Sequence, residues 1–158
     1  MADKRAGIDY LGVGVGVIIP NEEGKIPLTL RGPNTRNRHG LWALPGGGCE
    51  SEQNVGLWMG VLGATVTREV EEEIGLFIEP LGCIGFLEEL TDGQQWLDAI
   101  YVARIVGGTL ENREPHKFDA VAYFDPRRMP KRIANNTKAA VELYLRNPPY
   151  IPILSVVE

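Results

Sequence analysis

Apolar residues alternate strictly with other residues along residues 10–19, which read YLGVGVGVII. The branched side chains fall on one face of an extended chain and the glycines on the other: Val13, Val15, Val17 and Ile19 against Gly12, Gly14 and Gly16. This period of two predicts a β-strand. Because glycine weakens a strand, three glycines on one face indicate that a helix or a ligand packs close to the backbone there.

Further along the chain, the pattern predicts five more strands and two helices. A turn at residues 20–24 leads into a strand at 26–31, so the first two strands are predicted to form a hairpin. The other strands are predicted at residues 41–44, 82–88, 96–106 and 119–124. The helices are predicted at residues 61–74, where Gly75 ends the first, and at 137–146, where two prolines end the second.

Strands interleaved with two helices predict an α/β domain, in which helices cover the faces of a mixed sheet. The chain has 158 residues, the usual length of one domain, so residues 1–158 are predicted to form a single domain. A chain of this length buries roughly 68 to 70% of the surface that its unfolded form exposes, enough to fold without disulfide or zinc staples.

The charged residues argue against duplex DNA as a partner. The chain has 16 basic and 21 acidic side chains, and its net charge is −5. A phosphorylated substrate would therefore need cations placed locally, as metal ions or a few arginines. Cys49 and Cys83 form no CxxC pair, which indicates neither a zinc site nor a disulfide. No stretch approaches 18 uninterrupted apolar residues, so no membrane partner is expected and the cytoplasm is the expected location.

The first predicted helix carries the acidic residues with the clearest chemical meaning. Residues three and four apart share a helix face, so Glu69, Glu72 and Glu73 can converge, whereas Glu71 points elsewhere. Three converging carboxylates repel one another unless a cation lies among them, and hard divalent cations such as Mg²⁺ take oxygen ligands. Arg68 precedes Glu72 by one turn and is placed to fix a carboxylate. The alternative is an ordinary solvated acidic face.

The residues around this helix also fit a longer pattern. Gly46 is followed after five residues by Glu52, and residues 68–76 read REVEEEIGL. The chain resembles the Nudix hydrolases, whose signature reads Gly, five residues, Glu, seven residues, then Arg-Glu-apolar-any-Glu-Glu-any-Gly-apolar. The second half matches at every position, and LWALPGG at residues 41–47 resembles the family's entry into this loop. The resemblance implies an α/β/α sandwich with a mixed sheet.

The spacing between Glu52 and Arg68 departs from this signature. Fifteen residues separate them where the signature has seven. The excess predicts a longer loop that leaves the helix carboxylates in place but can displace Glu52. Trp58 and Met59 of this loop are candidates for core packing, for capping the site or for a subunit contact.

The resemblance implies hydrolysis of a nucleoside diphosphate linked to another group, with Mg²⁺ or Mn²⁺ as the cofactor. It places the metal on four glutamates: Glu52, Glu69, Glu72 and Glu73. The general base would be Glu69 or an acid of the later loop, where Glu114 is the next choice, and Arg68 would assist. An ion held there would neutralise phosphate charge and orient the attacking water.

Other residues are candidates for holding the substrate. Arg31, Arg36 and Arg38 form either a phosphate clamp or an ordinary arginine-rich surface loop. Gly46 and Gly47 either let the backbone approach the substrate or simply make a tight turn. The aromatic candidates for stacking on a base, with core packing as the alternative, are Trp96, Phe118 and Tyr123.

The compact outline of the chain favours one branch of the family. That branch hydrolyses a nucleoside triphosphate, ordinary or damaged, to NMP and pyrophosphate. An ADP-ribose or nucleotide-sugar pyrophosphatase stays open, as does a nucleotide-binding regulator without catalysis, although a pure binder has little use for self-repelling acids. A diphosphate isomerase of similar fold is disfavoured because no cysteine is convincingly placed as its acid. The expected partner is a small nucleotide, and a homodimer is common in the family.

Overall fold

The computed structural model describes residues 3–49 and 60–154, which form two helices and seven strands. The helices are α1 (Gly60–Ile74) and α2 (Asn135–Leu145). The strands are β1 (Gly12–Ile18), β2 (Ile26–Arg31), β3 (Trp42–Ala43), β4 (Gly46–Gly48), β5 (Leu76–Thr91), β6 (Gln94–Gly108) and β7 (Phe118–Phe124). None of the described helices is long and apolar enough to cross a membrane.

The strands form two separate sheets. The larger sheet has the order β4-β1-β6-β5, with β1 parallel to β6 and the other pairs antiparallel. The smaller sheet has the order β3-β2-β7 and is antiparallel throughout. The larger sheet is therefore mixed, as predicted.

The hairpin predicted for the first two strands is wrong, because β1 and β2 belong to different sheets. The turn itself is present, with the Asn21 side chain accepting hydrogen bonds from the backbone N–H groups of Glu23 and Lys25. Both edges of β1 are occupied, one by β4 and the other by β6, so β2 pairs with β3 and β7 instead.

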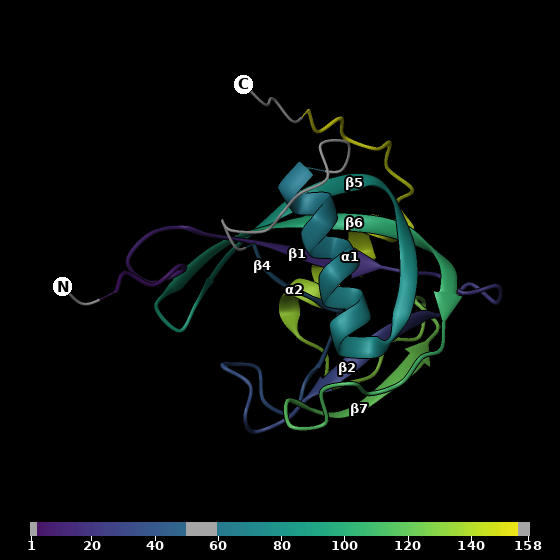
Figure 1. Ribbon diagram of the computed structural model, residues 1–158, viewed down its shortest axis with the longest axis horizontal. Helices are drawn as coiled ribbons and strands as arrows, with labels where there is room; N and C mark the ends of the chain where they lie inside the picture. The colour runs from purple at the N-terminus through teal and green to yellow at the C-terminus, as the bar shows by residue number, and fades with distance from the viewer. Residues whose placement is uncertain (1–2, 50–59, 155–158) are drawn as a thin grey trace.

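Two helices cover the larger sheet through two distinct cores (Figure 1). On one side, Val66, Val70 and Ile74 of α1 pack with Val15 and Val17. The second core combines α2 with the intervening positions of β1 and β6 and with β2: Ala140, Val141, Ile18, Ile100, Val102, Ile26 and Leu28. Successive residues of a strand point to opposite faces, so one strand serves both cores. The predicted α/β/α sandwich is confirmed.

Two strands differ from their sequence-based prediction. β5 begins at Leu76, six residues before the predicted start at 82, and follows α1 directly (Figure 1). Three register shifts interrupt its pairing with β6, and such bulges bend a strand. β4 consists of three glycines, which the sequence presents only as a loop. Pairing with β1 stabilises this segment despite the low strand propensity of glycine.

A helix or a ligand was predicted beside the glycine face of β1, but the close neighbour there is strand β6. Gly12, Gly14 and Gly16 lie opposite Trp96, Asp98 and Ile100 of β6. A Cβ atom on Gly12 would lie 2.5 Å from Cε3 of Trp96, and one on Gly14 would clash with the Asp98 carboxylate. The glycines therefore leave room for the side chains of β6.

Candidate active site

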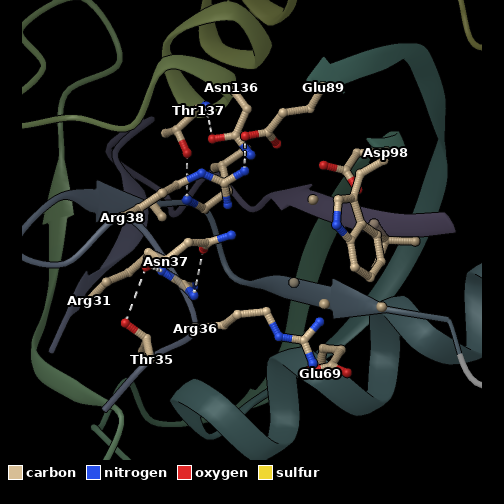
Figure 2. A pocket seen from close by; sticks show the side chains of 18 of the residues that line it. Arg31, Thr35, Arg36, Asn37, Arg38, Glu69, Glu89, Asp98, Asn136 and Thr137 are labelled. Carbon is tan, nitrogen blue, oxygen red and sulfur yellow. Dashed lines mark hydrogen bonds and ion pairs between the residues drawn. The ribbon is translucent and has the colours of Figure 1, made fainter. Parts of the chain in front are cut away.

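A cavity of about 610 Å³ opens where the loop after β2, strand β4 and helix α1 meet. Glu69 and Glu73 line it from α1, and Gly46 and Gly47 line it from β4. The loop contributes its arginines, β6 contributes Trp96 and Asp98, and α2 contributes Asn136. In Figure 2, Glu69 lies on the α1 side of this cavity, and Glu89 and Asn136 lie on the α2 side.

Arg68 joins two of the four predicted metal ligands. Its guanidinium donates one hydrogen bond to Oε1 of Glu69 at 2.6 Å and another to Oε2 of Glu72 at 2.8 Å. Burial raises the pKa of Glu69, and the charge of Arg68 partly offsets that effect. The predicted contact between Arg68 and Glu72 is thus present.

Glu73 occupies a different environment from the other two acids. Its side chain is only 6% exposed, and its Oε2 accepts a hydrogen bond from the backbone N–H of Gly46 at 3.1 Å. Burial raises the pKa of Glu73 to about 8, while the bond from Gly46 acts in the opposite direction. Glu69 and Glu73 share the cavity, and Glu69 and Glu72 share Arg68, but the three acids do not form one cluster.

The chemistry of these side chains fits a hard divalent cation. One guanidinium contacts both Glu69 and Glu72, so the two carboxylates lie on one side of α1 and offer the oxygen ligands that hard divalent cations take. Within residues 3–49 and 60–154, no three Asp, Glu, His or Cys side chains are grouped so that they could hold a metal ion. Mg²⁺ commonly binds through one or two carboxylates together with waters and substrate phosphates, so two glutamates meet its needs. Glu52, Trp58 and Met59 lie outside the described residues.

The buried carboxyl of Glu73 leads to a prediction about stability. The folded protein holds this proton more tightly than the unfolded chain, because the pKa rises from 4.5 to about 8. Its contribution to stability is complete below about pH 4.5 and is lost as the pH rises through about 8. Glu73→Gln keeps the acceptor for Gly46 and cannot ionise. When the pH is raised from 5 to 9, wild type is therefore expected to lose more unfolding free energy than the variant, by on the order of 3 to 5 kcal/mol.

Urea denaturation in EDTA at the two pH values measures this difference. Glu71→Gln, an exposed position on the same helix, is the matched control and is expected to follow wild type. The prediction is contradicted when Glu73→Gln and wild type lose the same stability between the two pH values.

The three loop arginines make different contacts. Arg31 donates a hydrogen bond from Nε to the carbonyl of Asn37 at 2.9 Å, and Arg38 forms an ion pair with Glu89. Arg36 is exposed, lines the cavity and forms no ion pair with any other described residue. Of the three, Arg36 has the guanidinium that a phosphate group can engage without breaking a described ion pair or hydrogen bond.

The loop between β6 and β7 carries the candidate base Glu114 and a lysine, Lys117. Glu114 accepts a hydrogen bond from Nζ of Lys117 at 2.7 Å. Lys117 lines the cavity, whereas Glu114 is absent from its described lining. Sequence reasoning missed Lys117, since a single lysine in a charged loop carries no local signal.

Sequence reasoning also missed the polar residues at the α2 side of the cavity. They are Glu89, Asp98 and Asn136, which come from β5, β6 and the start of α2. Burial raises the pKa of Asp98 to about 6, with further repulsion from Glu89. The only sequence signal was indirect, since Gly14 leaves space for Asp98. Of the aromatic candidates, Trp96 and Phe118 line the cavity, while Tyr123 is not part of its described lining.

The family model of the NUDIX domain matches residues 10–144. Curated protein sequences give no match. A MutT NUDIX hydrolase from Burkholderia pseudomallei is similar in structure, with a TM-score of 0.72 and 26% identity over 85% of this chain and 98% of that chain. A MutT protein from Methanosarcina mazei Go1 has a TM-score of 0.71 and 20% identity over 87% and 94%. An ADP-ribose pyrophosphatase from Streptococcus suis 89-1591 has a TM-score of 0.60 and 22% identity over 88% and 94%. Because the last two proteins are less than 25% identical to this chain, the comparison with them shows a shared fold and no more.

Proposed function

Because the chain belongs to the NUDIX family, whose hydrolases act on nucleoside diphosphate derivatives, we propose that it cleaves a nucleoside triphosphate to NMP and pyrophosphate. Family membership makes the chain a pyrophosphohydrolase. The choice of a triphosphate, ordinary or damaged, is the finer step and rests on the layout of the cavity.

One observation carries the proposal: a single cavity joins the acidic helix to cationic side chains and to an aromatic wall. Glu69 lines it from α1, Arg36 and Lys117 line it with positive charge, and Trp96 lines it from β6. A nucleoside triphosphate matches this lining from end to end, because its phosphates bind cations and its flat base stacks on aromatic rings. This match supports phosphates near α1 and the base near β6.

Glu69 is proposed as the general base. Burial raises the pKa of its carboxyl, which makes the carboxylate a stronger proton acceptor, and Arg68 holds it by a hydrogen bond of 2.6 Å. β4 passes close beside it, since a Cβ on Gly47 would lie 2.6 Å from Cδ of Glu69. Glu114 is the second candidate, and its bond to Lys117 equally fits a role in holding that lysine in place.

Glu69 and Glu72 are proposed to hold Mg²⁺ or Mn²⁺, with Glu73 and Glu52 as further candidate ligands. When bound, the ion neutralises the charge of the diphosphate that would otherwise repel an attacking water. Arg68 would then hold both carboxylates in position from the side of α1. Arg36 and Lys117 are proposed to contact the phosphates, with Arg31 and Arg38 shaping the loop that carries Arg36.

A panel of candidate substrates tests the proposal. The protein is incubated with Mg²⁺ and nucleoside triphosphates, ADP-ribose, nucleotide sugars or dinucleoside polyphosphates, and the products are separated by chromatography. Release of pyrophosphate together with NMP is the expected result. AMP with a sugar phosphate would instead indicate an ADP-ribose or nucleotide-sugar pyrophosphatase, and metal-dependent binding without turnover would indicate a regulator.

A further inference from the structure

Two acidic side chains at the α2 side of the cavity have no part in the proposed hydrolysis. Glu89 lies on β5 and Asp98 lies on the neighbouring strand β6, and both line the cavity. Figure 2 shows them on the side away from Glu69, together with Asn136 and Arg38. They are therefore separate from the acids of α1.

This pair of acids has fewer hydrogen-bond donors than its oxygens can accept. Oε1 of Glu89 pairs with Arg38, and the Glu89 side chain is 13% exposed. Its Oε2 is fully buried and has no partner among the residues that the structure describes. Asp98 is held by the side chain of Asn136. Uncompensated charge on a carboxylate is costly, so a ligand in the cavity that donates hydrogen bonds to the accessible part of Glu89 or to Asp98 would relieve part of that cost.

The wall beside these acids is flat and firmly positioned. Trp96 packs over the backbone of three glycines, since a Cβ on Gly7, Gly12 or Gly48 would meet its indole ring. Its ring N–H donates to Oε1 of Gln94 at 3.1 Å. The same ring lines the cavity, and a planar base gains stability by stacking on such a ring. An aromatic wall next to paired acceptors fits a base with hydrogen-bond donors along one edge.

We propose that Glu89 and Asp98 accept hydrogen bonds from the N1–H and the amino group of a guanine base lying against Trp96, so that this side of the cavity selects guanine nucleotides. Guanine presents two adjacent donors along this edge. Adenine and cytosine place an acceptor beside their amino group, and uracil flanks its N–H with carbonyl oxygens, so each would turn an acceptor toward a carboxylate. The inference rests on the proposed function, because it assigns the base of the same nucleotide.

Inosine triphosphate provides the sharpest test, since it differs from GTP only by lacking the amino group. Wild type is expected to favour GTP over ITP by roughly tenfold or more in kcat/KM. Glu89→Gln and Asp98→Asn each replace an acceptor oxygen by an N–H₂ donor. Because ITP keeps the N1–H, the variant that removes the acceptor of the amino group is expected to bring the GTP to ITP ratio close to one, whereas the other variant is expected to lower kcat/KM for both nucleotides. Glu88→Gln, an exposed neighbour on β5, is the matched control and should keep the wild-type ratio. Circular dichroism checks that the variants are folded.

Calorimetric binding of GMP and IMP in EDTA separates this inference from the proposed function, because no turnover is needed. Preferred binding of GMP that either Glu89→Gln or Asp98→Asn abolishes supports the inference, even when no triphosphate is hydrolysed and the proposed function fails. Hydrolysis with a GTP to ITP ratio near one, or a ratio unchanged in both variants, overturns the inference and leaves the proposed function standing. Neither binding nor hydrolysis of any nucleotide overturns both.

Discussion

Glu69→Gln is expected to lower kcat by about 10²- to 10⁴-fold while leaving the fold intact, the usual cost of losing a general base. Glu69 both accepts a hydrogen bond from Arg68 and lines the cavity. Glutamine keeps the size of the side chain and its acceptor for Arg68, but it removes the negative charge. Pyrophosphate release at saturating substrate and Mg²⁺ measures the loss.

Glu71→Gln is the matched control, because Glu71 lies on the same helix and is exposed. It is expected to retain wild-type turnover. Glu72→Gln, which removes the other carboxylate held by Arg68, is expected to lose most turnover as well. Wild-type rates in both Glu69→Gln and Glu72→Gln would show that the acids of α1 have no role in the reaction.

Gly46→Ala is expected to destabilise the fold by at least about 3 kcal/mol. Gly46 has a φ of 151°, a conformation that residues with a Cβ rarely adopt. An added Cβ would also collide with the carbonyl oxygen of Val15 on the paired strand β1. That contact involves backbone on both sides, so no side chain can move to relieve it. Urea denaturation followed by circular dichroism measures the loss of unfolding free energy.

Gly48→Ala on the same strand provides the comparison. A Cβ there would lie 3.4 Å from the ring of Trp96, which is ordinary van der Waals contact, and Gly48 has no positive φ. This variant is expected to unfold within about 1 kcal/mol of wild type, since neither strain nor overlap is introduced. Equal stability of Gly46→Ala and wild type would mean that β4 can move away from β1.

The acidic helix could be predicted closely because its signals are local. The helix was predicted at residues 61–74 and is observed at Gly60–Ile74, ending before Gly75, whose φ is 72°. The contact between Arg68 and Glu72 follows from helical spacing alone. Helical spacing also places Glu73 near Glu69 and Glu72, but it says nothing about what lies beneath Glu73. The backbone N–H of Gly46 lies there, and burial separates Glu73 from the other two acids.

By itself, the sequence determined the helices, most strands, the family and the acidic face of α1, because each depends on residues a few positions apart or on a contiguous motif. Only the tertiary structure decided that β1 pairs with β4 and β6 rather than with β2, and that three glycines form β4. It also decided that Glu89 and Asp98 share a cavity with Glu69. Strand partners and cavity walls depend on chain segments far apart in sequence, whose mutual approach no local periodicity encodes.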